Sequence, residues 1–83
     1  MYEHTLADLI SQAFFSAGWA MHWVQLSPSG KCATAGYTYP WGTKNPQFFI
    51  DINRVNGLVE SIDVWGVDDN GGKGIFCGTL PLL

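Results

Sequence analysis

Helical periodicity occurs once in this 83-residue sequence, close to its N-terminus. Apolar residues there follow the three- and four-residue spacing of one helical face. They are Leu6, Leu9, Ile10, Ala13, Phe14 and Ala17. Thr5 can cap the first turn together with Asp8, and Gly18 suits the left-handed position that ends many helices. The pattern predicts one helix over about residues 5–17.

The rest of the chain has the signatures of strands joined by turns. Strands are expected at residues 19–26, 31–39, 48–54, 58–67 and 75–80, the last ended by Pro81. The glycine-rich stretch 68–74 is a predicted turn, and 40–46 is a predicted surface loop between two hairpins. These elements predict an α+β fold, with one N-terminal helix packed on a four- to five-stranded, mainly antiparallel sheet.

The loop of the first hairpin indicates its register. Pro28-Ser29-Gly30 has the proline and glycine that favour a three-residue loop with a bulge. The resulting register pairs Trp23 with Ala35 and Met21 with Tyr37. Large side chains would then gather on one face, and we expect that face to lie under the helix.

Two registers compete in the second hairpin. A two-residue Asn56-Gly57 turn scatters the apolar residues over both faces of the sheet, because a shift by one residue turns a strand over. A three-residue loop at 55–57 instead pairs Ile50 with Ile62 and gathers one apolar stripe, so we expect this register. The outer face would then carry Phe49, Asp51, Asn53, Val59, Ser61, Asp63 and Trp65.

Composition narrows the classes of function. Charged residues make up 13% of the chain and give a net charge of −3, against roughly 25% charged residues in an ordinary soluble domain. The negative charge disfavours direct nucleic-acid binding, which depends on neutralising phosphates. The chain is short enough that we expect a single domain over 1–83. Aromatic residues make up 14% of it. Apolar area is therefore expected to remain for a partner or for a homodimer.

Cysteine usage and the N-terminal segment predict a cytoplasmic protein without a membrane segment. Cys32 and Cys77 form no C-x-x-C motif and no disulfide framework. A single disulfide between them stays open if their strands are neighbours. Asp8, Ser11 and Gln12 interrupt the N-terminal apolar stretch, which disfavours a signal peptide or a membrane span.

No catalytic or metal-binding motif stands out, and we expect no enzyme, no metal and no cofactor. His22 and Cys32 would lie ~13 Å apart along their hairpin, beyond hydrogen-bonding reach. The acidic turn at 68–72 lacks the glutamate that completes a calcium loop. Asp51 and Asp63 are expected as diagonal neighbours at ~7–8 Å. An acidic recognition surface is the favoured interpretation of this pair, and a small enzyme is an alternative.

The favoured function is a small protein-binding inhibitor that presents an acidic and aromatic surface to a basic partner, such as a nucleic-acid-handling protein. The candidate partner-binding residues are Trp41, Phe49, Asp51, Asp63, Trp65, Asp68 and Asp69.

Chains of this size and charge are common among phage-encoded inhibitors of bacterial defence, such as anti-CRISPR proteins, and among toxin-immunity proteins. No residue motif here identifies either family. A carbohydrate- or small-ligand-binding module is the alternative, with Tyr37, Tyr39 and Trp41 as a stacking platform.

Overall fold

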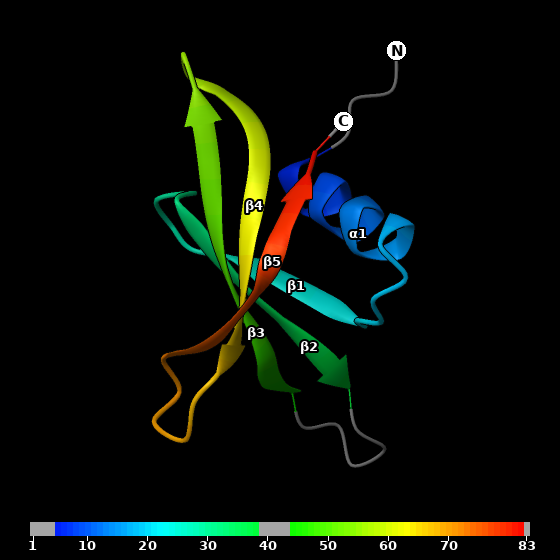
Figure 1. Cartoon of the computed structure of the whole chain (residues 1–83), viewed down its shortest axis with the longest axis vertical. Coiled ribbons are helices and arrows are strands. Elements are labelled where there is room, and N and C mark those ends of the chain that lie inside the picture. Colours follow the sequence, from blue (N-terminus) through cyan, green and yellow to red (C-terminus); the bar gives the residue numbers. More distant parts are fainter. Residues whose placement is uncertain (1–4, 39–43, 83) are drawn as a thin grey trace.

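One helix and five strands make up the described part of the computed structural model, which covers residues 5–38 and 44–82 (Figure 1). The helix is α1 (Leu6–Ser16), and the strands are β1 (Trp23–Leu26), β2 (Cys32–Thr38), β3 (Lys44–Val55), β4 (Leu58–Val67) and β5 (Lys73–Pro81). The strands form a single antiparallel sheet in chain order, so each strand pairs with the next. The predicted α+β architecture is confirmed.

Helix α1 begins and ends where the sequence predicts. Thr5 Oγ1 accepts a hydrogen bond from the backbone N–H of Asp8 at 3.2 Å, and Asp8 Oδ2 accepts one from the N–H of Thr5 at 3.3 Å. Gly18 follows the helix with a φ of 77°. Ile10 and Phe14 are fully buried, so the predicted apolar stripe is the face that packs on the sheet.

The first hairpin has a register one residue away from the prediction. Trp23 pairs with Gly36, and Val24 pairs with Ala35. The loop holds four residues, 28–31, because the residues on either side of it are joined by a backbone hydrogen bond of 2.9 Å. The predicted pairing of Trp23 with Ala35 is therefore wrong.

The shifted register turns β1 over relative to β2, so that Val24 rather than Trp23 shares a face with Ala35. Ala33 and Ala35 are buried beneath α1, where their small side chains let the helix approach the sheet. Trp23 lies on the opposite face, and its Nε1 donates to the carbonyl of Tyr37 at 3.1 Å. Trp19, which precedes β1, packs against the core as expected, with its ring edge-on to Phe14 at 5.7 Å.

The second hairpin contains the two-residue turn that the apolar pattern disfavours. Asn56 and Gly57 have φ angles of 53° and 81°, and Val55 pairs with Leu58 across them. Two consecutive residues with positive φ are typical of the type I′ turn, whose twist matches that of the flanking strands. The predicted three-residue loop is therefore wrong.

A β-bulge close to this turn restores the apolar stripe. The register shifts after Asn53, and Glu60 of β4 is the extra residue. Ile50 consequently pairs with Val64 rather than with the expected Ile62. Because the observed register differs from the predicted one by two residues at Ile50, the side chains there keep their predicted faces.

The outer-face residues of this hairpin therefore agree with the prediction, except for one. Val59 packs against the core instead, because the bulge changes the alternation next to it. The strand bounds also differ from the prediction. β1 begins at Trp23, so residues 19–22 of the predicted first strand lie outside it. Residues 44–46 belong to β3 rather than to a loop, and β5 is longer than the predicted strand at 75–80.

The hydrophobic core lies between α1 and one face of the sheet, which we call the inner face. Its buried side chains are Ile10, Phe14, Ala33, Ala35, Ile50, Ile52, Ile62, Val64 and Leu80. No polar or charged side chain is buried in residues 5–38 and 45–82. Figure 1 shows α1 on one side of the sheet only, so no described element covers the opposite face.

Candidate interaction surface

The uncovered side of the sheet carries most of the predicted site residues, and we call it the outer face. Its central side chains come from the last three strands. They are Phe49, Asp51, Asp63, Trp65, Lys73, Phe76 and Thr79.

An aromatic strip runs across the middle of the outer face. Phe49 on β3 pairs with Trp65 on β4, which pairs in turn with Phe76 on β5. The rings of Trp65 and Phe76 meet edge to face at a centroid distance of 4.9 Å. Phe76 is 49% exposed. Large apolar rings with open surface of this kind are typical of interaction sites.

One hydrogen-bond donor in this strip has no partner. Trp65 Nε1 is the single buried side-chain nitrogen or oxygen without an acceptor among the residues that the structure describes. Leaving such a donor unpaired costs about 1–3 kcal/mol.

Two carboxylates lie beside the strip. Asp51 and Asp63 pair directly across β3 and β4, not diagonally as predicted. Asp51 forms an ion pair with the ammonium of Lys73, and Asp63 Oδ1 accepts a hydrogen bond from Thr79 Oγ1 at 2.7 Å. Like charges directly opposite each other in a sheet are destabilising, and the Lys73 ammonium offsets that repulsion.

Lys73 is a part of the surface that the sequence does not predict. Its Nζ lies 5.3 Å from the centre of the Trp65 ring and 5.9 Å from that of Phe49. The glycine-rich stretch 68–74 predicts a turn, whereas β5 already begins at Lys73. Only the pairing of the strands brings Lys73 here, because its side chain extends from β5 across β4 to the Asp51 carboxylate on β3.

The other two predicted acids lie in the turn between β4 and β5. Asp68 Oδ1 accepts hydrogen bonds from the backbone N–H groups of Asn70 at 2.9 Å and Gly72 at 2.8 Å, so this carboxylate closes the turn. Asp69 is exposed. Within the described residues, the outer face and this turn present four carboxylates and the Lys73 ammonium. Trp41, the remaining predicted site residue, lies outside the described residues.

The alternative sites suggested by cysteine and histidine are not assembled. His22 Nδ1 accepts a hydrogen bond from the N–H of Thr38 at 3.0 Å, whereas Cys32 pairs with Asp51 in β2 and β3. Cys32 and Cys77 are both free, and β3 and β4 separate their strands. Three strand spacings amount to ~14 Å, which is too far for a disulfide.

The proposed stacking platform of the alternative function is only partly described. Tyr37 lies edge-on to Phe48 at 6.4 Å and to His22 at 5.6 Å, so its ring is part of an aromatic cluster on the inner side. A cavity of about 390 Å³ opens beside it, lined by Trp19, Ala20, Tyr37, Phe48 and Cys77. Tyr39 and Trp41 lie outside the described residues.

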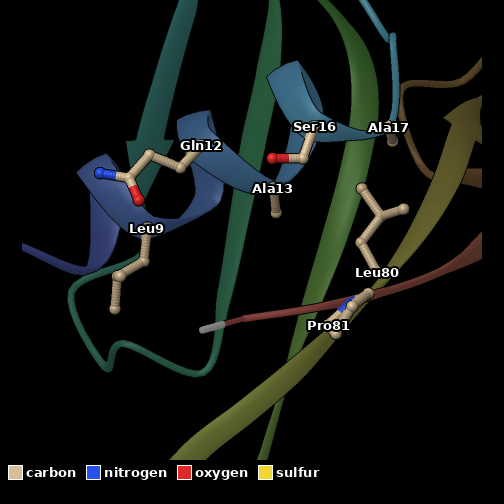
Figure 2. A pocket seen from close by; sticks show the side chains of 7 residues that line it. All are labelled: Leu9, Gln12, Ala13, Ser16, Ala17, Leu80 and Pro81. Carbon is tan, nitrogen blue, oxygen red and sulfur yellow. The ribbon is translucent and has the colours of Figure 1, made fainter.

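A second cavity lies between the helix and the last strand. It has a volume of about 210 Å³, and its lining comes from α1 and from the end of β5. Figure 2 shows Leu9 and Ala13 of the helix pointing toward the side on which Leu80 and Pro81 lie. The lining is mostly apolar and presents no ionisable side chain.

The described part of the chain contains neither a group of metal ligands nor a membrane-spanning helix. No three His, Cys, Asp or Glu side chains in residues 5–38 and 44–82 lie close enough to hold a metal ion. No helix in those residues has the length and apolar character needed to span a bilayer.

Similarity to known proteins does not indicate a function. The chain matches no protein-family model, no curated protein and no solved structure at a significant level. Function is therefore inferred from the outer face.

Proposed function

We propose that this protein binds a basic protein partner through the outer face of its sheet and inhibits it by occupying its basic surface. The observation that carries this proposal is the aromatic strip of Phe49, Trp65 and Phe76, flanked by carboxylates on a sheet face that no described element covers. The proposed partner is a nucleic-acid-handling protein, because its basic groove accepts negative charge in place of phosphates.

The rings supply the affinity in this proposal. Aromatic side chains that become fully buried at an interface are the commonest energetic hot spots. Phe76 is half exposed, and a hollow of about 210 Å³ lies beside Phe49, lined also by Gln25, Pro28 and Thr34. A protruding side chain of the partner can fill this hollow while the strip is buried.

The carboxylates supply selectivity and speed of association. Asp69 is exposed at the turn between β4 and β5, and Asp51 and Asp63 lie next to the aromatic strip. Complementary charge mainly increases the association rate and discriminates against wrong partners. Exposed charges are screened beyond about 10 Å at 0.1 M salt, so binding is expected to weaken as the salt concentration rises.

A charge-reversal pair tests the proposal. Asp69→Lys changes an exposed acid beside the outer face, and Glu60→Lys makes the same change near the tip of the β3–β4 hairpin, at the other end of the molecule in Figure 1. Both variants and the natural protein are used to capture partners from a bacterial lysate at about 0.05 M and about 0.5 M salt, with quantitative mass spectrometry.

The proposal expects one basic protein to be captured at low salt, to be lost at high salt, and to be reduced by Asp69→Lys but not by Glu60→Lys. Equal loss in both variants, capture that is insensitive to salt, or no enrichment of a basic protein would each contradict it. If only the Glu60→Lys variant loses the captured protein, the binding surface lies at the tip of the β3–β4 hairpin and the proposal is wrong.

A further inference from the structure

We propose that the outer face is a binding site for an arginine side chain of the partner, and that Lys73 occupies this site in the free protein. This inference rests on the proposed function and names the chemistry that the surface recognises. In this view Lys73 is an internal stand-in for a cation that the partner supplies.

The geometry around Lys73 is that of a cation site. The ammonium lies over the rings of Trp65 and Phe49, at 5.3 Å and 5.9 Å from their centres. Asp51 provides the counter-charge, and Asp63 lies directly opposite Asp51. Aromatic faces within ≈ 6 Å attract cations through the negative charge on the ring face, and the carboxylates add direct ion pairing.

The Lys73 side chain is weakly held in this site. The side chains of Lys73 and Asp51 are 42% and 32% exposed, and solvent-exposed ion pairs contribute little to stability. Lys73 also follows directly after the glycine-rich turn, at the first position of β5. Its long, flexible side chain can therefore leave the rings at little cost when a better cation arrives.

An arginine fits the site better than the lysine that fills it. A planar guanidinium stacks on an aromatic ring and presents several donors in a fixed fork, whereas an ammonium acts as a compact point charge. Asp51 and Asp63 face each other across two strands. One guanidinium can therefore reach carboxylate oxygens of both residues, while Lys73 pairs with Asp51 and Asp63 takes its hydrogen bond from Thr79.

If Lys73 competes with the partner, its removal strengthens the binding of arginine to the outer face. A lysine that only stabilises the sheet would leave arginine binding unchanged when it is replaced. A lysine that contacts the partner directly would weaken binding when it is replaced.

The test is an NMR titration of the whole protein with N-acetyl-arginine N-methylamide, following the indole N–H of Trp65. This signal is assigned by its disappearance in Trp65→Phe. Lys73→Gln is expected to bind the probe with a dissociation constant about fivefold lower than that of the natural protein. The glutamine analogue of the probe should bind neither protein, and the lysine analogue should bind Lys73→Gln less tightly than the arginine probe.

Three variants make the result specific. Lys73→Met removes the charge and keeps most of the alkyl chain, so it should match Lys73→Gln and serves if that variant folds poorly. Lys31→Gln removes an exposed lysine from the β1–β2 loop and should bind like the natural protein. Asp51→Asn added to Lys73→Gln should abolish the gain, because it removes the counter-charge.

Failure of this inference is distinguishable from failure of the proposed function. If Lys73→Gln and Lys73→Met bind the arginine probe no better than the natural protein, the inference is wrong. Salt-sensitive capture that depends on Asp69 would still support the proposed function in that case. If both variants bind arginine more tightly but no basic protein is captured, the cation site stands and the proposed function is wrong.

Discussion

The two faces of the sheet are built from the same strands and have opposite character. On β4, Ile62 and Val64 are fully buried under the helix, whereas Asp63 and Trp65, which alternate with them, lie on the outer face. The inner face is apolar and closed by α1. The outer face is aromatic and charged, and it carries an unsatisfied donor at Trp65. The hydrophobic core therefore forms on the inner face alone, and the proposed function uses the outer face.

The largest expected effect comes from breaking the inner face. Phe14 is fully buried and contacts the rings of Trp19 and Phe48. Phe14→Ala should lower the free energy of unfolding by about 3–5 kcal/mol, because it removes buried area and leaves a cavity. Urea denaturation measures this loss. A loss below about 1 kcal/mol would show that the helix does not close the core as described.

A smaller effect is expected at Gly36, where β2 and β3 approach each other closely. A Cβ added at Gly36 would lie 2.6 Å from the carbonyl oxygen of Asn45 and 3.1 Å from the backbone nitrogen of Gln47. Gly36→Ala should therefore cost about 1–3 kcal/mol by forcing β2 and β3 apart. Gly66→Ala is the matched strand control, because its Cβ would meet no atom closer than 3.6 Å. Equal unfolding free energies for the two variants would contradict the close approach at Gly36.

The smallest effect is expected on the outer face itself. Asp63→Asn keeps an acceptor for the Thr79 hydroxyl and removes a charge that faces Asp51. The free energy of unfolding should change by less than about 1 kcal/mol, in either direction. A loss comparable with that of Phe14→Ala would erase the distinction between the two faces.

The helix could be predicted closely, because its signals are local. The apolar spacing, the capping pair of Thr5 and Asp8, and Gly18 all act within one segment, and each is found in the structure. The strand registers depend instead on bulges and on loop lengths. The first hairpin differs from the prediction by one residue, which moves Trp23 to the outer face and Val24 to the inner.

The second hairpin shows why an error in register need not move the site. At Ile50 the observed pairing differs from the predicted one by two residues, which preserves the faces. Phe49 and Trp65 therefore lie on the outer face as predicted. The turn chemistry of Asn56-Gly57 and the apolar pattern are both satisfied, because Glu60 is taken up in a bulge.

The part of the site that could not be predicted comes from β5. Lys73 reaches Asp51 across β4, and this contact depends on two register shifts between β4 and β5. Gly78 and Gly74 lie beside the two shifts, and glycine in a strand often marks a bulge, but it does not specify which residues then pair. A surface of acids and rings was therefore predicted without the cation at its centre.

The most direct measurement of the division between the two faces compares neighbouring residues on one strand. Ile62→Val trims a buried side chain of the inner face, and Asp63→Lys reverses a charge on the outer face. For each variant, the measured quantity is the amount of basic partner captured per folded molecule. Ile62→Val should lose about 0.5–1.5 kcal/mol of stability and keep full binding, whereas Asp63→Lys should stay folded and lose the partner. Equal binding by both folded variants would contradict the account.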